Sequence, residues 1–233
     1  MSNNWGDTEA NLMPVKHLPM ATASPQVKPK KRLPDWFRTR LPNGEQQAIF
    51  NTTKAAVKDN KLHTVCEEAR CPNIHDCWAS GDATFMVAGQ ECTRGCKFCA
   101  VGTVSRPPPL DADEPQHLAD AVASMNLRHA VITVVNRDDL LDSGADHYKK
   151  CIAAVAERSP ELTLELLCSD LAGDLEALAH LLEDSPLSVF AHNVECVPRL
   201  DRTVRDVRAS FTQSLSILCL LYTSDAADEY DRV

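Results

Sequence analysis

Short apolar runs alternate with stretches of helical periodicity through the second part of the chain. The runs are largely apolar and occupy residues 84–89, 130–135, 163–168 and 188–193. Such runs are typical of strands that are buried on both faces of a parallel sheet. The pattern therefore predicts an α/β protein built from about four strand–helix units.

Helices are predicted between these strands and ahead of them. Residues 114–126, 145–159 and 174–184 repeat apolar side chains at helical spacing, and the second and third follow the turn sequences DSG and AG. The stretch EQQAIFNTTKAAVKDN, residues 45–60, has helix-forming composition. Before it, residues 1–44 are rich in proline and polar residues and contain the basic run KPKKR. We expect residues 1–60 to be a flexible extension with a lead-in helix.

Composition and charge restrict the class of protein. The chain has 233 residues, of which 44% are hydrophobic, enough for one sizeable core. A net charge of -9 argues against nucleic acid as a partner, because phosphate binding needs clustered Lys and Arg. No run approaches the roughly 18 apolar residues of a membrane helix, and the start MSNNWGDTEANLMP lacks the apolar core of a secretory signal. We expect a cytoplasmic protein without a membrane partner.

Ten cysteines are present, and their distribution is uneven. Reducing cytosol disfavours disulfides, so metal binding is the better interpretation. The four scattered cysteines, Cys151, Cys168, Cys196 and Cys219, are expected to be ordinary small core residues. The other six crowd into two groups between residues 66 and 99.

The second group, CTRGCKFC, has the spacing C-x3-C-x2-C and begins three residues after the first predicted strand. Cys92, Cys96 and Cys99 can bind three irons of a four-iron cluster and leave the fourth iron open to a reacting ligand. In a β/α barrel, the loop after a strand lies on the face where catalytic groups gather. The position of this group therefore favours chemistry as much as its spacing does.

The first group, CEEARCPNIHDC, places Cys66, Cys71 and Cys77 at C-x4-C-x5-C spacing with no obvious fourth ligand. Structural zinc normally takes four ligands in paired short spacings, although pooling the six thiols with His63 or His75 would still build zinc sites. A ferredoxin relay cluster would be expected to have four cysteines.

The segment LHTVCEEARCPNIHDCWASGDATFMVAGQECTRGCKFCAV resembles the double-cluster region of the lipoyl synthases, a family of radical S-adenosylmethionine (SAM) enzymes. The similarity continues through VSRPPPLDADEP, VVNRDDLLDSGADHYKKCI and VFAHNVECVPRLDRTVRDVRASFTQSL, and covers about residues 29–218. Many radical enzymes share the second cysteine group, whereas the first group distinguishes this family. The resemblance implies a partial TIM-type (β/α) barrel of the radical SAM kind over residues 84–218, with about four of six strand–helix units. An N-terminal double-cluster extension precedes it.

The resemblance also implies a reaction. Cys92, Cys96 and Cys99 would hold a [4Fe-4S] cluster that binds SAM and cleaves it to a 5'-deoxyadenosyl radical. Residues 61–83, with Cys66, Cys71 and Cys77, would hold an auxiliary [4Fe-4S] cluster. That cluster gives sulfur to carbons 6 and 8 of a protein-bound octanoyl group. The implied partners are octanoylated lipoyl-carrier domains, of the 2-oxoacid dehydrogenase or glycine cleavage type, and a low-potential electron donor such as ferredoxin or flavodoxin.

Further candidates lie at strands and turns. Glu165 and Asn193 are polar residues in apolar runs, so they are candidates for binding the methionine or ribose end of SAM, or else are satisfied buried polar groups. Gly144 is a candidate on a cofactor-facing turn, where Ser143 replaces the first of two glycines common in the family. His129 and His192 are expected to pack or to hydrogen-bond.

Arg137, Asp138 and Asp139 follow the second predicted strand, where they would shape the mouth of a cavity or form a local salt-bridge network.

Two other functions remain open, a different sulfur-inserting radical SAM enzyme and a non-catalytic metal-binding module. The resemblance stops near Leu218, and residues 219–233 resemble a translated sequencing adapter, so we expect a non-native tail. The family's remaining strand–helix units and its distal serine, a fourth ligand of the auxiliary cluster, do not follow. A barrel left open there is expected to expose a sheet edge and to leave this chain inactive.

Overall fold

A computed structural model describes residues 43–59, 63–68 and 71–230, with the backbone alone at 59, 63, 68 and 222–230. Most of the predicted flexible extension, residues 1–42, lies outside the described residues. Its lead-in helix is present as α1 (Gly44–Asp59). No helix in the described part of the chain is long and apolar enough to cross a membrane.

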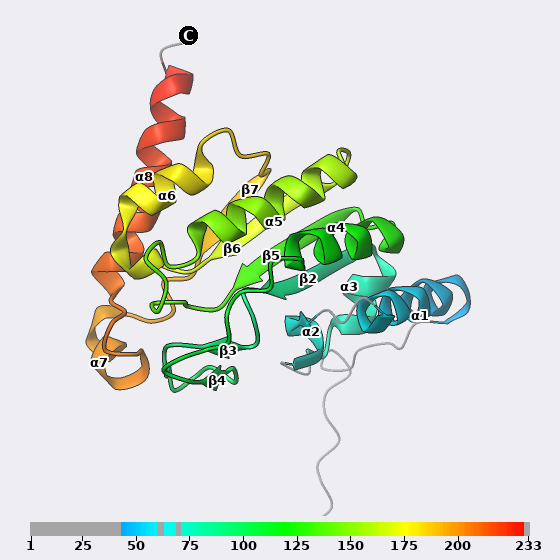
Figure 1. Cartoon of the computed structure of the whole chain (residues 1–233), viewed down its shortest axis with the longest axis horizontal. Helices are drawn as coiled ribbons and strands as arrows, with labels where there is room; N and C mark the ends of the chain where they lie inside the picture. Colours follow the sequence, from blue (N-terminus) through cyan, green and yellow to red (C-terminus); the bar gives the residue numbers. More distant parts are fainter. Residues whose placement is uncertain (1–42, 60–62, 69–70, 231–233) are drawn as a thin grey trace, which may run out of the picture. The chain divides into compact units, whose positions relative to one another are not determined.

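A five-stranded sheet forms the centre of the described residues, in the order β1-β2-β5-β6-β7 (Figure 1). Four strands run parallel: β2 (Asp82–Val87), β5 (His129–Val134), β6 (Thr163–Cys168) and β7 (Val189–His192). The short β1 (His63–Thr64) pairs antiparallel with β2. These parallel strands coincide closely with the four predicted apolar runs.

Three helices cover one face of the sheet. Helices α4 (Glu114–Met125), α5 (Ala145–Arg158) and α6 (Leu175–Leu182) follow the strands and pack side by side in chain order, as Figure 1 shows. Each agrees with a helix that the periodicity predicts. Helix α4 has a proline in its first turn and is followed by Asn126, which takes the left-handed conformation that asparagine tolerates.

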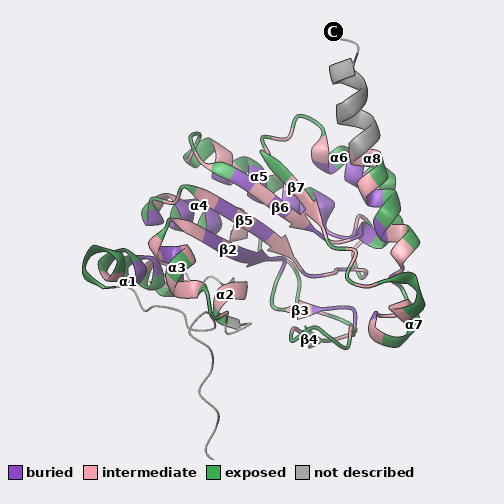
Figure 2. Cartoon of the chain, turned by 180° about the vertical axis from the view of Figure 1, so that it is seen from behind, coloured by how far each residue is buried: buried purple, intermediate pink, exposed green. Residues whose placement is uncertain are grey.

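The two faces of the sheet differ in burial. Phe85, Ile132 and Leu166 lie in register on adjacent strands and are each at most 1% exposed, and purple marks the sheet and the inner sides of α4 and α5 in Figure 2. The alternate positions, such as Val131 and Glu165, are only partly buried. Because strand side chains alternate between faces, one face is sealed by helices and the other lines an open lumen.

Shorter elements surround this core. They are α2 (Val65–Glu68), α3 (Ile74–Ala79), β3 (Glu91–Cys92), β4 (Gly102–Thr103), the 3-10 turns η2 (Leu171–Gly173) and η3 (Pro198–Leu200), α7 (Asp201–Val204) and α8 (Phe211–Tyr230). The sequence pattern predicted none of them. Within the described residues, β7 ends the sheet opposite β1, so the strands form an open partial (β/α) barrel, as expected.

Candidate functional site

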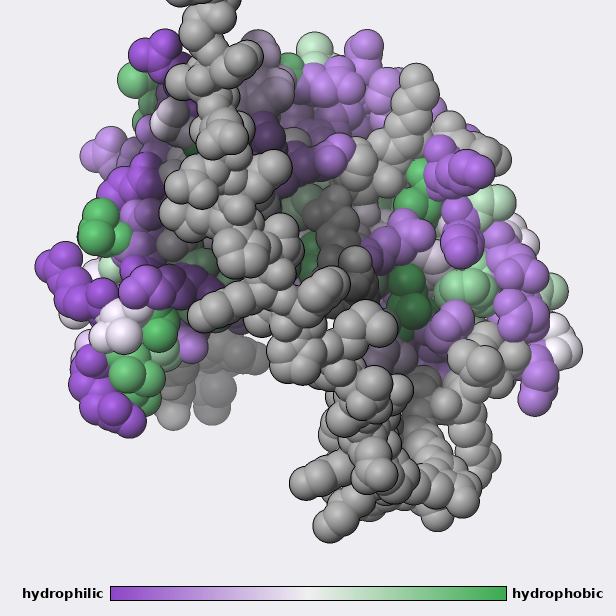
Figure 3. Space-filling view, turned by 90° about the horizontal axis from the view of Figure 1, so that it is seen from below, coloured by the Kyte–Doolittle hydropathy of each residue, from purple (hydrophilic) through white to green (hydrophobic). Residues whose placement is uncertain are grey.

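A cavity of about 310 Å³ lies where the parallel strands end. Its wall includes the last residues of β2, β5, β6 and β7 together with the loop after β3 and the segment before α8. The lining side chains include those of Val65, Cys92, Arg94, Cys96, Cys99, Asp170, His192, Asn193 and Arg205. Figure 3 shows the molecule from the side of β3, β4 and α7, where the visible described surface is mostly hydrophilic with small apolar patches. The cavity lies on the face where barrel enzymes carry their reactive groups.

All three cysteines of the second group line this cavity. Cys92 is buried at the end of β3, Cys96 is half-buried and Cys99 is exposed. The Arg94 N–H donates to Cys92 Sγ at 3.4 Å, and the Asp206 N–H donates to Cys96 Sγ at 3.3 Å. Burial raises the pKa of the Cys96 thiol, and the nearby Cys92 and Cys99 raise it further. The three cysteines therefore share one cavity wall.

Arg94, a spacer residue of the cysteine motif, fixes the loop to two strand ends. Its guanidinium is buried and lies 2.6 Å from Asp138 after β5 and 2.7 Å from Asp170 after β6. Burial alone would lower the pKa of Arg94. The two carboxylates have a larger opposite effect and hold this pKa well above its usual value. Burial alone would raise the pKa of Asp138, yet Arg94 and Thr93 lower it. The charged side chains of Arg94, Asp138 and Asp170 are thus paired with one another where little of their surface reaches solvent.

A second clamp comes from residues 204–208. The Lys97 N–H donates to Val204 O at 2.8 Å, and the Gly95 N–H donates to the Asp206 carboxylate at 2.9 Å. Arg208 pairs with Asp206 at 2.9 Å and with Asp138 at 3.2 Å. The loop that carries Cys96 is therefore held from both sides.

The first cysteine group lies beside the same cavity. Cys66 is on α2, Cys77 is on α3, and the Cys71 N–H donates to Cys66 O at 3.0 Å. Burial raises the pKa of the Cys77 thiol, and the nearby Cys66 and Cys71 raise it further. Val65, the neighbour of Cys66, lines the cavity. The second group therefore lines the cavity, whereas the first group reaches it only through Val65.

Neither cysteine group is compact enough for a single ion. Among the described residues, the only set of three His, Cys, Asp or Glu donor atoms within 4.8 Å of one another is Glu114, His147 and Cys151, away from both groups. A tetrahedral zinc site needs Zn–S bonds of about 2.3 Å and hence closely spaced sulfurs. By this measure, neither cysteine group presents three donors as close together as those of Glu114, His147 and Cys151.

The other predicted cofactor residues lie in three different settings. Asn193 lines the cavity directly after β7. Glu165 faces the lumen nearer the other end of β6 and pairs with His129 at 3.3 Å. Gly144 precedes α5 with a φ of 92°, packed against Tyr148, and neither it nor Glu165 is among the cavity-lining residues. The structure brings only Asn193 of these to the cysteines.

His192 is a cavity residue whose role the sequence did not indicate. Its Nδ1 lies 2.9 Å from Cys168 O, an acceptor, so Nδ1 carries the proton. The Nε2 atom is buried and has no partner in the described structure. Because a buried acceptor without a partner costs free energy, this nitrogen is suited to accept a hydrogen bond from a bound molecule. Its position at the end of a strand was the one available signal.

Arg137 forms a local network. Its guanidinium donates to Ala88 O and Pro108 O, each at 3.0 Å, and to both Asp139 oxygens at 2.9 Å. The Asp139 carboxyl pKa is lowered chiefly by these Arg137 hydrogen bonds. Of the two expected roles, this geometry agrees with a salt-bridge network, while Asp138 serves the Arg94 clamp.

Two family models match the sequence. A model described as the N-terminal domain of lipoyl synthase of the radical SAM family matches residues 17–71, and the radical SAM superfamily model matches residues 86–221. The chain belongs to the radical SAM superfamily, in its lipoyl synthase family. Membership implies SAM and iron-sulfur clusters as cofactors.

Curated relatives agree with this assignment. The chain is 48% identical over 221 residues to "Lipoyl synthase, mitochondrial" of Trypanosoma brucei gambiense, covering 91% of this chain and 53% of the relative. It is 48% identical over 192 residues to the Bos taurus protein of that name, covering 80% and 50%. The Rattus norvegicus protein is 44% identical over 221 residues, covering 93% and 55%. The chain spans about half the length of the curated relatives it matches.

The expected cytoplasmic location is wrong. These relatives are named as mitochondrial proteins, which points to mitochondria instead. The expectation rested on the missing apolar core of a secretory signal. Mitochondrial targeting peptides are amphipathic and rich in Arg and Ser, so an apolar core does not discriminate between cytoplasm and mitochondria.

Proposed function

We propose that this chain carries the catalytic front part of a lipoyl synthase, which inserts two sulfur atoms at carbons 6 and 8 of a protein-bound octanoyl group. The carrying observation is that Cys92, Cys96 and Cys99 line one cavity, whose wall also includes Val65, the neighbour of Cys66. A reactive centre and a sulfur source placed at one cavity are what such a reaction needs.

The second cysteine group fits an open-iron cluster by its donors. Cys92, Cys96 and Cys99 would bind three irons, and the fourth would face the cavity that these residues line. When bound, the cluster supplies the electron that cleaves SAM to a carbon radical. The N–H donors of Arg94 and Asp206 would stabilise the sulfur charge and adjust the reduction potential.

The cavity walls would bind and shield SAM. The unpartnered His192 Nε2 would accept a hydrogen bond from SAM, and Asn193 would offer both an amide donor and an acceptor. Met86, Val135 and Leu167 contribute apolar wall, which would exclude water and stray hydrogen donors from a radical reaction. Glu165 and Gly144, both further away, would support the frame.

Cys66, Cys71 and Cys77 would hold the auxiliary cluster as the sulfur source. The buried Trp78 beside Cys77 fixes this segment to the core. We infer that the substrate is an octanoylated lipoyl-carrier domain, that a ferredoxin or flavodoxin supplies electrons, and that the reaction takes place in mitochondria.

The test is anaerobic reconstitution with iron and sulfide, followed by iron counting and mass spectrometry of an octanoylated carrier peptide supplied with SAM and reductant. About eight irons per chain, 5'-deoxyadenosine and a gain of two sulfurs would establish the function.

Other outcomes separate the rivals. SAM cleavage without sulfur gain would retain a radical enzyme and reject sulfur insertion by this chain. Bound zinc in place of iron, with no SAM cleavage, would instead indicate the metal-binding module.

A further inference from the structure

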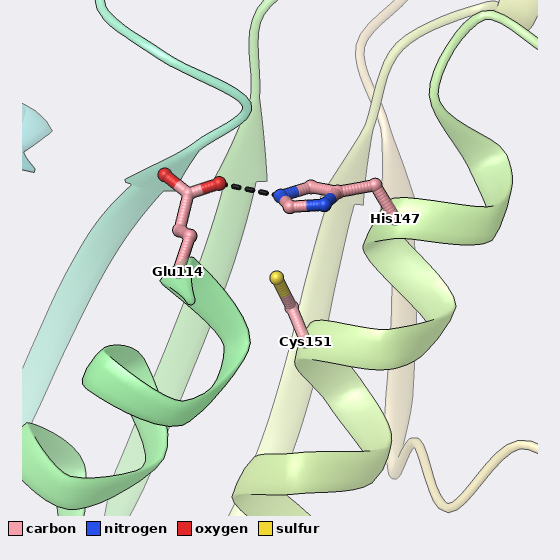
Figure 4. Close-up of side chains that lie close together, drawn as sticks. All are labelled: Glu114, His147 and Cys151. Carbon is pink, nitrogen blue, oxygen red and sulfur yellow. Dashed lines mark hydrogen bonds and ion pairs between the residues drawn. The ribbon is translucent and has the colours of Figure 1, made fainter. Parts of the chain in front are cut away.

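A second donor cluster lies outside the cavity, between α4 and α5. Glu114 is in the first turn of α4, and His147 and Cys151 are four residues apart on α5 (Figure 4). Their donor atoms, one carboxylate oxygen, one ring nitrogen and one sulfur, all lie within 4.8 Å of one another. Figure 4 shows all three side chains pointing toward a common space. The proposed sulfur insertion uses none of them.

We propose that Glu114, His147 and Cys151 form a binding site for one divalent transition-metal ion, with zinc as the favoured occupant. Imidazole, carboxylate and thiolate together are a zinc ligand set, and the thiolate disfavours magnesium and calcium. A water molecule would complete the tetrahedron, because no fourth His, Cys, Asp or Glu of the described chain joins the group. One Cys and one Glu, both ionised, would neutralise the charge of the ion.

The site is preorganised by its surroundings. His147 is 7% exposed, and Cys151 is fully buried on the same face of α5, one helical turn apart. The Ala88 N–H donates to Glu114 Oε2 at 2.9 Å and orients that carboxylate, as outer partners of metal ligands do. Helices α4 and α5 pack directly against each other, so the ligands come from rigid elements.

Without an ion, a proton occupies the same space. His147 Nε2 lies 2.5 Å from Glu114 Oε2, so the ring donates from Nε2 to the carboxylate. On binding, the ion would replace the Nε2 proton and the Cys151 thiol proton, and the ring would carry a proton on Nδ1 instead. The ring stays neutral, so each ion bound releases one net proton to solvent.

The site would brace the second cysteine group from behind. Ala88 directly follows β2 and has a positive φ of 68°, and its carbonyl accepts from Arg137 while its N–H donates to Glu114. The chain then runs directly into β3 and Cys92. An ion that joins α4 to α5 would therefore hold the strand end from which the cluster loop starts. We therefore assign a structural role to the proposed metal ion.

The test uses the full chain with both clusters reconstituted, so that the six cluster thiols are occupied. Zinc chloride is added, loosely bound metal is removed with a weak chelator, and zinc per chain is counted by mass spectrometry. X-ray absorption at the zinc edge, distinct from iron, reports the ligands. We expect one zinc with one sulfur and the rest nitrogen or oxygen, and a higher melting temperature with zinc.

Matched variants decide the assignment. Cys151→Ala and Glu114→Gln should each lower retained zinc at least tenfold and abolish the zinc-dependent rise in melting temperature. Cys219→Ser, at an exposed cysteine, should retain zinc like the parent. Glu114→Gln keeps the shape and an acceptor for Ala88, and circular dichroism checks its fold. Undiminished zinc in both variants, several sulfur ligands, or no retained zinc in the parent would overturn the proposal.

Discussion

The two cysteine groups border one cavity but are held in different ways. The second group is tied down by ion pairs and hydrogen bonds from distant segments, through Arg94 to Asp138 and Asp170 and through Gly95 to Asp206. In the first group, the hydrogen bonds among the described residues are local, such as Cys71 N–H to Cys66 O. In addition, backbone N–H groups reach two sulfurs of the second group.

This difference agrees with different fates for the two clusters. A cluster that passes electrons repeatedly benefits from fixed geometry and from N–H donors that set its potential. A cluster that surrenders its sulfur must come apart, so few fixed contacts suit it. The contrast supports the proposed roles of electron source and sulfur source.

Separate loss of each cluster is the strongest test of this comparison. Cys96→Ala should remove about four irons per chain and abolish both SAM cleavage and sulfur insertion, because an open-iron cluster needs its three thiolates. Cys71→Ala should also remove about four irons but leave SAM cleavage within about threefold of the parent. Iron counting and chromatography of 5'-deoxyadenosine provide the readout.

The control is Cys196→Ala, outside both groups. Equal loss of SAM cleavage in the Cys71 and Cys96 variants would show that the groups do not have separate roles.

Removal of the Arg94 guanidinium should give the next largest effect. Arg94→Met leaves Asp138 and Asp170 without their buried partner, which should lower the free energy of unfolding by about 3–5 kcal/mol. Chemical denaturation of the apoprotein measures it. Arg128→Met removes an exposed partner of Asp82 and should cost less than about 1 kcal/mol. Similar losses in the two variants would contradict the proposed clamp.

A change at Gly144 tests the frame behind the second group. A Cβ there would lie 2.7 Å from Tyr148 Oη at a left-handed φ of 92°, and this hydroxyl donates to Val135 O in the cavity wall. Gly144→Ala should therefore destabilise the chain by about 1–3 kcal/mol. Gly102→Ala, which meets nothing within 4 Å, should stay within about 0.5 kcal/mol. Thermal unfolding compares them, and equal melting temperatures would count against this strain.

The smallest expected effect concerns pH. Arg137 lowers the pKa of Asp139, so the pair stabilises the fold above the ordinary aspartate pKa of about 3.9 and loses this contribution as pH falls through the lowered value. Asp139→Asn should cost less than about 1 kcal/mol at pH 7, and the difference from the parent should vanish in acid. Unfolding in urea at several pH values measures the gap. If the difference in unfolding free energy between parent and variant grew as the pH fell, the predicted pH dependence would be wrong.

The repeating part of the fold followed from the sequence. Two strands and one helix were visible as apolar runs at 130–135 and 163–168 and as helical periodicity at 145–159. The order of apolar and polar residues in such elements reflects which of their faces are buried, so it can be recognised in the sequence alone. The family motifs also singled out the two cysteine groups as candidates, and the metal of these groups stays a prediction. The motifs did not show that the two groups lie near one cavity, because this depends on the order of the strands in the sheet.

Other features had no local signal. Arg94 is a charged spacer in a metal motif, and its partners lie 44 and 76 residues away. The two-residue strands β3 and β4 are too short to show periodicity. Glu165 was expected near SAM because it is polar in an apolar strand. The sequence does not show how far along the strand the cavity begins, and Glu165 pairs with His129.

The bond between Gly95 and Asp206 closes a loop across 111 positions. The segment that carries Cys96 can take its final shape only when residues 204–208 are in place, whereas the hydrogen bonds of residues 66–80 join near neighbours in the sequence. Such long-range closure is the slow part of folding. We therefore expect the loop of the second cysteine group to reach its final shape later than the segment that carries the first group.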